Sequence, residues 1–120
     1  MVLRLRCNIS SVERSYIPNI LIWELSCGDV SIRMDIHKLI ALFRRGDSVE
    51  VTISKTLPDY RKGEDIVARG YVITKRSEGD LHKLLISLWG FLVVVSSRDP
   101  KVFDEFNPVD EVFMKISRAS

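Results

Sequence analysis

Residues 84–95 read LLISLWGFLVVV, a run in which nearly every side chain is apolar. A strand with one face in a core and the other in water alternates apolar with polar side chains, and this stretch does not. A helix that spans a bilayer needs about 20 apolar residues, so the run is too short to cross a membrane. Protein must therefore cover both faces of this segment.

Taken as one strand, the run divides into two sets of side chains that point to opposite faces. The first set is aliphatic and suits a barrel interior: Leu84, Ile86, Leu88, Gly90, Leu92 and Val94. The second set includes both aromatic residues: Leu85, Ser87, Trp89, Phe91, Val93 and Val95. A bulge at Gly90 would exchange the two faces partway along. Two alternatives stay open for the second face, cover by helical segments of this chain or cover by another protein.

Apolar residues at every second position predict strands along most of the remaining chain. The predicted strands cover residues 1–8, 19–26, 30–36, 47–54, 65–75 and 110–117. Gly28, the loop over 55–64 and the loop over 77–80 supply turns between them. Cys7 and Cys27 have no CxxC spacing, and with only two histidines in the chain they do not form a zinc site. In a reducing compartment we expect both to be buried thiols rather than a disulfide.

The spacing of apolar residues changes after Asp35, which predicts a short helix there. Asp35 is a suitable N-cap, and Gly46 can end the helix. The residues that share its apolar face are Ile36, Leu39, Ile40 and Phe43. A second helical turn is predicted at Val102, Phe103 and Phe106, before Pro108.

About six to eight strands with short turns and one or two short helices predict an all-β fold. Gly70 and Gly90 fall within predicted strands, where glycine permits the sharp bends or bulges of a small barrel. We expect a single domain over residues 1–120, a small closed or partly open barrel of the oligonucleotide/oligosaccharide-binding (OB) type.

The charge balance gives no general case for nucleic-acid binding. The chain has 18 basic and 16 acidic residues and a net charge of +2, whereas nucleic-acid-binding domains have a basic excess or stripe. The first residues alternate charge with aliphatic side chains and lack the apolar core of a secretory signal. We therefore expect a cytoplasmic protein.

The residues that could carry catalysis do not form a recognisable pattern. His37 and His82 lie at predicted element starts, carboxylates are scattered, and the glycines are isolated rather than grouped in a phosphate-binding loop. We expect no catalytic residue, no metal and no cofactor. A freestanding single-strand-binding barrel stays open as an alternative, since such barrels combine basic grooves with aromatic side chains for stacking. Its contacts would be Arg44, Arg45, Tyr60, Arg61, Lys62, Lys75 and Arg76.

A series of short motifs runs in order through residues 20–118. The first half contains Cys27, then Met34-Asp35-Ile36, Gly46-Asp47, Val51-Thr52-Ile53-Ser54 and Thr56-Leu57. The second half contains Ile66-Val67-Ala68-Arg69-Gly70-Tyr71-Val72, Ser87-Leu88-Trp89-Gly90-Phe91-Leu92, Phe106 and Val109-Asp110. In this order the motifs resemble the eighth subunit shared by eukaryotic nuclear RNA polymerases. They resemble more closely its shorter archaeal counterpart, the G subunit of the archaeal DNA-directed RNA polymerase.

Two departures from the eukaryotic pattern fit the archaeal form. A compact loop over 58–64 stands where eukaryotic members carry a long acidic insertion, and Trp89 replaces the first glycine of a Gly-Gly pair. The resemblance implies an OB-type barrel that is a non-catalytic accessory subunit of a multisubunit DNA-dependent RNA polymerase.

The resemblance also implies a partner for the second face of the apolar run. Family members contact the largest polymerase subunit by protein–protein interaction, so any contact with nucleic acid is expected to be indirect, and no membrane is involved. The interface residues that we predict are Trp89, Phe91, Val93 and Val95.

Overall fold

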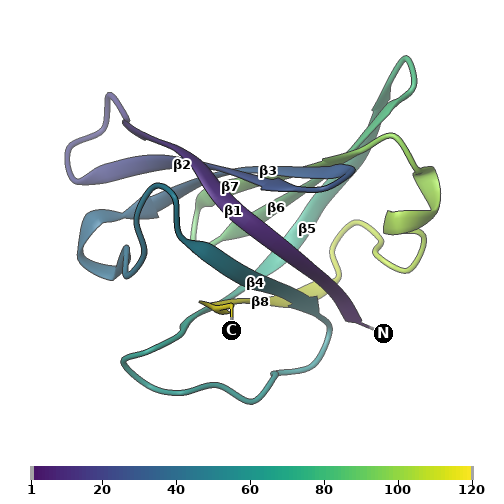
Figure 1. Cartoon of the computed structure of the whole chain (residues 1–120). Helices are drawn as coiled ribbons and strands as arrows, with labels where there is room; N and C mark the ends of the chain where they lie inside the picture. Colours follow the sequence, from purple (N-terminus) through teal and green to yellow (C-terminus); the bar gives the residue numbers. More distant parts are fainter. Residues whose placement is uncertain (1, 120) are drawn as a thin grey trace.

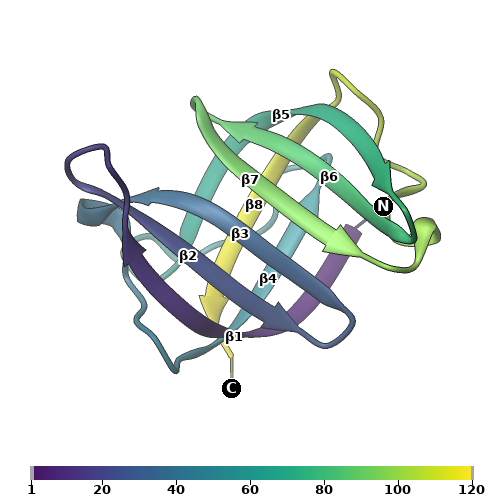
Figure 2. The same cartoon turned by 90° about the horizontal axis from the view of Figure 1, so that it is seen from above.

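The computed structural model describes residues 2–119, which form a closed β-barrel of eight strands (Figures 1 and 2). The strands are β1 (Val2–Arg14), β2 (Ile20–Cys27), β3 (Val30–His37), β4 (Ser48–Ser54), β5 (Ile66–Glu78), β6 (Leu81–Leu88), β7 (Phe91–Ser97) and β8 (Glu111–Arg118). Two short 3₁₀ helices complete the fold, η1 (Lys38–Ile40) and η2 (Pro100–Phe103). Met1, which we placed in the first strand, and Ser120 lie outside the described residues.

The order of strands around the barrel is β1-β2-β3-β7-β6-β5-β8-β4, with β4 paired back to β1. Every neighbouring pair is antiparallel. Closure leaves one side of each strand facing the interior, which explains the period-two pattern of the sequence. The prediction of an all-β, OB-like barrel is confirmed.

The apolar run is two strands rather than one. β6 ends at Leu88 and β7 begins at Phe91, so Trp89 and Gly90 form a two-residue turn with φ values of +55° and +87°. Positive φ at both central residues is typical of the type I′ turn that joins twisted antiparallel strands. The prediction of a single strand with a bulge at Gly90 is wrong, because the chain reverses there.

The hairpin fills the barrel interior with alternate residues from both strands. Leu84 is paired with Val95 and Ile86 with Val93, and all four side chains are fully buried. They join a core that also contains Trp23, whose side chain is completely enclosed. Phe103 of η2 and Phe106 are buried against the same core. A helical turn predicted at Val102, Phe103 and Phe106 is present as η2, but it ends at Phe103 and Phe106 follows it.

The helix predicted after Asp35 is absent. Asp35 lies inside β3, which continues to His37 and pairs with β2 up to the Ile20–His37 pair. Only one 3₁₀ turn follows, η1, and its Leu39 and Ile40 are exposed. Pairing with β2 satisfies the backbone over this segment, whereas a short helix would first have to meet the cost of nucleation.

A disulfide joins Cys7 of β1 to Cys27 of β2. Asn8 is paired with Ser26, so the two cysteines lie at the next opposed position, with Cα atoms 4.2 Å apart. This is the close spacing of a non-hydrogen-bonded antiparallel pair. The prediction of two free thiols is wrong, because it rested on the compartment and not on the register of β1 against β2.

We expect loss of this disulfide to lower the free energy of unfolding by about 3 kcal/mol, since the bridge closes a loop of 20 residues. The Cys7→Ala/Cys27→Ala double variant should show the loss in denaturant unfolding, and wild-type protein unfolded in excess dithiothreitol should match it. A double variant as stable as the oxidised wild type would contradict this expectation.

Gly70 lies in β5 where the backbone of β6 approaches closely. A Cβ atom at this position would lie 1.9 Å from the carbonyl oxygen of Ser87 and 2.9 Å from Cδ2 of Leu88. Glycine is therefore required at this position by the contact between strands. The bulge in β5 lies slightly further on, between Val72 and Thr74.

Candidate interaction surfaces

The four predicted interface residues do not share one face. Val93 and Val95 are fully buried in the barrel core, and Phe91 is partly buried opposite Leu88 at one end of the barrel. Only Trp89 is well exposed, with 69% of its surface accessible. The buried positions are even-numbered in β6 and odd-numbered in β7, because the chain reverses at the turn. Counting every second residue straight through the turn therefore assigns the side chains of β7 to the wrong face.

Trp89 carries two costs that folding of the barrel alone does not explain. An L-residue with positive φ is strained by about 1–2 kcal/mol, and asparagine is the residue favoured at this place in a type I′ turn. A large apolar ring is also left in water. The turn itself is held firmly, because the backbone N–H of Gly90 donates to Oγ of Ser87 at 3.2 Å. Trp89 is thus presented to solvent on a well-defined turn.

Next to Trp89, the outward side of the β6–β7 hairpin is apolar. Leu85 is paired with Val94 and Ser87 with Leu92, on the side opposite the core. Tyr71 of β5 is paired with Ser87 and is half exposed. We name this surface the hairpin face and define it by Tyr71, Leu85, Trp89, Leu92 and Val94. It combines Leu85 and Trp89 of the second set with Leu92 and Val94 of the first, and it lies on the side of the hairpin opposite the core.

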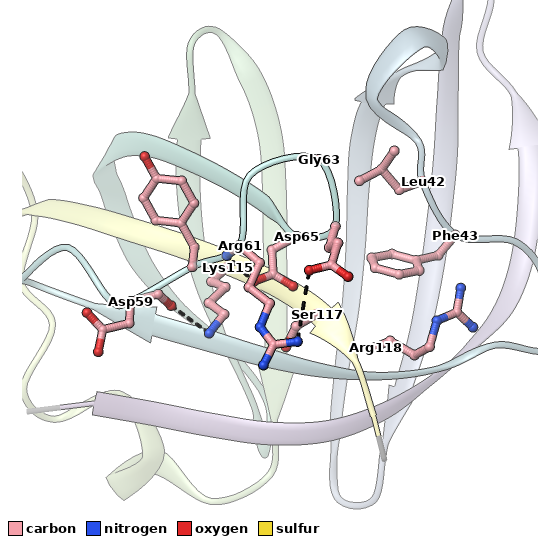
Figure 3. Close-up of a pocket in the computed structure, with 11 residues that line it drawn as sticks. Leu42, Phe43, Asp59, Arg61, Gly63, Asp65, Lys115, Ser117 and Arg118 are labelled. Atoms are coloured by element: carbon pink, nitrogen blue, oxygen red, sulfur yellow. Dashed lines mark hydrogen bonds and ion pairs between the residues drawn. The ribbon is translucent and has the colours of Figure 1, made fainter.

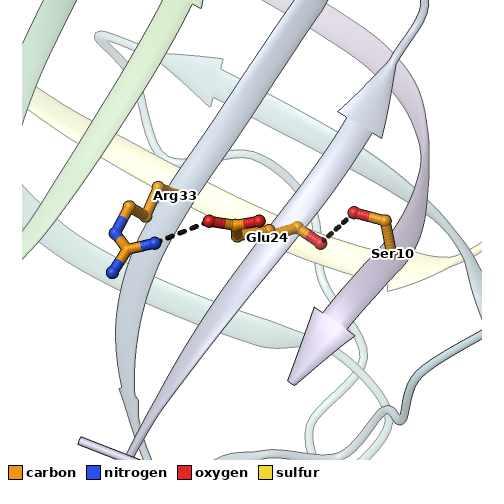
Figure 4. A network of polar contacts seen from close by, with 3 residues as sticks. All are labelled: Ser10, Glu24 and Arg33. Atoms are coloured by element: carbon orange, nitrogen blue, oxygen red, sulfur yellow. Dashed lines mark hydrogen bonds and ion pairs between the residues drawn. The ribbon is translucent and has the colours of Figure 1, made fainter. Parts of the chain in front are cut away.

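A polar contact network borders the hairpin face. Arg33 of β3 lies beside Val94, and its Nη1 is 2.6 Å from Oε1 of Glu24 on β2 (Figure 4). Ser10 Oγ donates to the backbone carbonyl of Glu24 at 3.0 Å, at the point where the register of β1 shifts. These groups form a polar border on one side of an apolar surface, an arrangement found at protein interfaces.

The structure separates the residues proposed for nucleic-acid contact. Tyr60 and Arg61 line a groove of about 780 Å³. The groove lies between the loop over 59–65, the segment of Leu42 and Phe43, and β8 (Figure 3). Lys62, Arg44 and Arg45 are exposed but lie outside its lining. Lys75 and Arg76 belong to the part of β5 that projects toward the β5–β6 turn, far from the groove (Figure 1).

The charges that line the groove cancel. Its basic residues are Arg61, Lys115 and Arg118, and its acidic residues are Asp59, Glu64 and Asp65. The basic groups are also engaged: Nζ of Lys115 donates to the Asp59 carbonyl at 2.7 Å, and Arg118 stacks over the Phe43 ring at 5.6 Å. Arg61 lies 3.9 Å from Glu64. Single-strand binding requires a groove of net positive charge, and this groove does not have one.

The two histidines of the chain each form a hydrogen bond with a residue close by in the sequence. Nδ1 of His37 accepts from the backbone N–H of Leu39 at 3.1 Å, and His82 is hydrogen-bonded to Ser77 at 2.8 Å. Within residues 2–119, no group of three or more metal-ligating side chains comes together. The same residues contain no helix that is long and apolar enough to cross a bilayer.

Asp110, which belongs to one of the quoted motifs, stabilises the turn before β8. Its carboxylate accepts from the backbone N–H of Asn107 at 2.8 Å and lies 3.1 Å from Nζ of Lys55. These contacts, the Asn107 N–H first, hold the pKa of Asp110 below its usual range. The carboxylate thus has a structural role at this turn.

Comparison with known families places the chain in a class of protein. The model of the RpbG family, which is the G subunit of DNA-directed RNA polymerase, matches residues 2–119. The chain belongs to this family. The resemblance read from the sequence motifs is confirmed, and the chain is a subunit of DNA-directed RNA polymerase that acts in transcription as part of the polymerase complex.

Relatives of this RpbG-family chain come from archaea. DNA-directed RNA polymerase subunit Rpo8 of Saccharolobus solfataricus is 29% identical over 95% of this chain and 91% of its own length. Rpo8 of Sulfolobus acidocaldarius is 29% identical over 93% of this chain and 94% of its own. A solved structure of the cytoplasmic molybdate-binding protein ModG with molybdate bound covers 95% of this chain and 89% of its own, with 12% identity. Its TM-score is 0.38, which is too low to carry an argument.

Sequence reasoning missed most of the hairpin face in this RpbG-family chain. It placed Leu92 and Val94 in the barrel interior, but both point outward. It named Tyr71 only within a family motif and not as an interface residue, although Tyr71 is half exposed on β5. The signal in the sequence was Gly90. Interpreted as part of a two-residue turn rather than as a bulge, it makes residues 84–95 a hairpin and places Leu85, Leu92 and Val94 on one face.

Proposed function

We propose that this polymerase subunit is non-catalytic and docks on the largest subunit of the enzyme, where it supports assembly or stability of the complex in the cytoplasm. The observation that carries the proposal is Trp89, an exposed tryptophan on a strained but well-held turn beside an apolar face. Strain and exposure that do not serve folding are expected where a residue serves binding. Tryptophan is also among the residues that most often dominate the energy of protein interfaces.

The hairpin face supplies the remaining contact surface. Trp89 would insert as the anchor, with Leu92 and Tyr71, both about half exposed, as neighbouring contacts. Of the four residues first predicted, Trp89 remains a direct contact and Phe91 lies at the edge. Val93 and Val95 would act only through the core, since their side chains are fully buried.

The role that we propose is contact rather than chemistry. His37 and His82 each bond a neighbour in the same turn or hairpin, and Asp110 holds a turn, so these groups serve local structure. An apolar interface is also insensitive to salt, whereas phosphate contacts weaken steeply as salt rises. Salt therefore separates the proposed function from nucleic-acid binding.

The test is purification of the tagged chain from its native cells with high-salt washes, combined with a photo-crosslinking residue in place of Leu92. We expect recovery of the polymerase in equal amounts and a crosslink to the largest subunit. A photo-crosslinker at Leu57, an exposed leucine outside the hairpin face, is the matched control and should give no such crosslink. A crosslink from Leu92 only to another subunit would overturn the docking partner. Recovery with nucleic acid alone, removed by salt, would overturn the proposal as a whole.

A further inference from the structure

The loop between β1 and β2 and the 3₁₀ turn η1 meet at one end of the barrel (Figures 1 and 2). The N–H of Lys38 donates to the carbonyl of Asn19 at 2.8 Å, which ties η1 to the loop. Within the loop, the N–H of Ser15 donates to the carbonyl of Ile20 at 3.0 Å. Oγ of Ser15 also accepts from the N–H of Ile17 at 3.2 Å. The side chains on these two segments are therefore held by a hydrogen-bonded backbone.

This end of the barrel exposes large apolar side chains. Tyr16 is fully exposed, Ile17 is 61% exposed and Leu39 is 85% exposed. η1 contributes no buried residue, although two of its three residues are leucine and isoleucine. We name this surface the loop end and define it by Arg14, Tyr16, Ile17, Lys38 and Leu39. A group of exposed apolar side chains on a fixed backbone is typical of an interaction site.

A pocket of about 470 Å³ at the loop end has unbalanced positive charge. Among the described residues that line it, the charged ones are Arg14 and Lys38, and none is acidic. Within residues 2–119, neither cation forms an ion pair or a side-chain hydrogen bond. The acidic residues next to this end, Glu13 and Asp35, are both paired with Ile22 and point to the outer wall. They do not line the pocket.

The chemistry of the pocket suits a carboxylate that is followed or preceded by apolar side chains. Ile17, Pro18 and Leu21 form the apolar part of the lining. A carboxylate between the two cations would accept charge-assisted hydrogen bonds, which are stronger than neutral ones. The aliphatic surroundings favour a protein over a nucleic acid, because bases stack on aromatic side chains and Tyr16 is the single aromatic residue of the loop end.

The loop end and Trp89 lie at the same end of the barrel. β3 runs toward η1, and Met34 near its end is paired with Val93 near the start of β7. Because β3 and β7 are antiparallel, the turn at Trp89 lies beside the end of β3 from which η1 continues. A partner that contacts Trp89 is thus close enough to contact the loop end as well.

We propose that the loop end is a second contact site for the polymerase subunit on which this chain docks, and that it receives an acidic segment of that subunit with neighbouring apolar residues. A carboxylate of the segment pairs with Arg14 and Lys38, and its apolar residues pack on Ile17 and Leu39. The inference rests on the proposed docking function and adds the chemistry of the partner segment. The hairpin face supplies an apolar anchor, and the loop end selects the partner by charge.

A binding titration of the full chain with polymerase assembled without this subunit tests the charge contact. The Arg14→Met/Lys38→Met variant keeps unbranched side chains and removes both charges. We expect it to bind about tenfold more weakly than wild type at about 0.1 M salt. At about 1 M salt, where the Debye length is about 3 Å, the two should agree within about twofold.

The Lys62→Met/Arg98→Met variant is the matched control. Lys62 and Arg98 are exposed and lie outside both the loop end and the hairpin face, so the control removes the same charge elsewhere. It should bind as wild type does at both salt concentrations. Since all four substituted residues are exposed, both variants should keep the thermal unfolding temperature of wild type.

A photo-crosslinking residue in place of Tyr16 identifies the occupant. We expect a crosslink within the assembled polymerase to a segment that contains aspartate or glutamate, in the same subunit that Leu92 reaches. A crosslink to nucleic acid, or to a segment without acidic residues, would overturn the inference.

The titration separates this inference from the docking proposal. If Arg14→Met/Lys38→Met binds as tightly as wild type at low salt, or if its weaker binding is unchanged at high salt, the charge contact is overturned. Docking by the hairpin face is then judged by Trp89→Asn, which leaves the loop end intact. Weaker binding by both variants, with the effect of salt confined to the loop-end variant, supports both proposals.

Discussion

Trp89→Asn is expected to make the free chain more stable and its docking weaker. Asparagine tolerates the positive φ at this turn better than tryptophan, so the free energy of unfolding should rise by about 1 kcal/mol. Removal of the ring should weaken binding to polymerase assembled without this subunit by about 30-fold, the loss of a 2 kcal/mol interface anchor. Thermal unfolding and a binding titration measure the two effects.

The opposite signs of the two effects make this variant informative. Damage to the fold would lower both the stability of the chain and its binding. Removal of a strained residue that serves binding raises the stability and weakens the binding. Tyr60→Asn is the matched control, because Tyr60 is a half-exposed aromatic residue in the loop over 55–64 and lies outside the hairpin face. It should leave binding unchanged. Unchanged binding of the Trp89→Asn variant would remove Trp89 as the docking anchor.

Gly70→Ala is expected to cause the largest loss of stability of any single methyl group added to this chain. The new Cβ would lie 1.9 Å from the Ser87 carbonyl oxygen and 2.8 Å from its carbonyl carbon, and both atoms belong to backbone that cannot rotate away. β5 and β6 would have to separate at the place where they pair. We expect a loss of about 4 kcal/mol or more in the free energy of unfolding, measured in denaturant.

Gly79→Ala is the comparison, because Gly79 is favoured by its backbone conformation and not by a close contact. Gly79 has a φ of +63°, but a Cβ there would meet open space. Its replacement should cost about 1 kcal/mol from backbone strain alone. Similar losses for the two variants would mean that β5 and β6 part easily at Gly70, contrary to the contact described.

The strands could be predicted from the sequence because closure of the barrel places alternate residues inside. The turn at Trp89 was missed, because tryptophan is not a turn-forming residue, the apolar run continues across it, and Gly90 alone indicated a reversal of the chain. The helix predicted after Asp35 shows the limit of local pattern, since pairing with β2 decides the backbone of that segment. The disulfide depends on the register between β1 and β2, which no spacing of two cysteines reveals.

The candidate site followed from these same features. Trp89 could be singled out from the sequence because it is an aromatic residue in an unusually apolar run and replaces a glycine of the family pattern. Val93 and Val95 were predicted to share a face with Trp89 because alternate residues were counted across the turn, whereas the reversal of the chain places both in the core.

The bond between Cys7 and Cys27 also decides what happens if the backbone is cut. The two cysteines enclose residues 8–26, and that stretch contains the exposed loop with Tyr16 and Ile17. Exposed loop tips are where proteases cut first. A single cleavage between Tyr16 and Ile17 would leave two peptides that are still covalently joined, each remaining in its own strand of the wall. The oxidised chain can therefore be broken once at its most accessible point and stay one molecule.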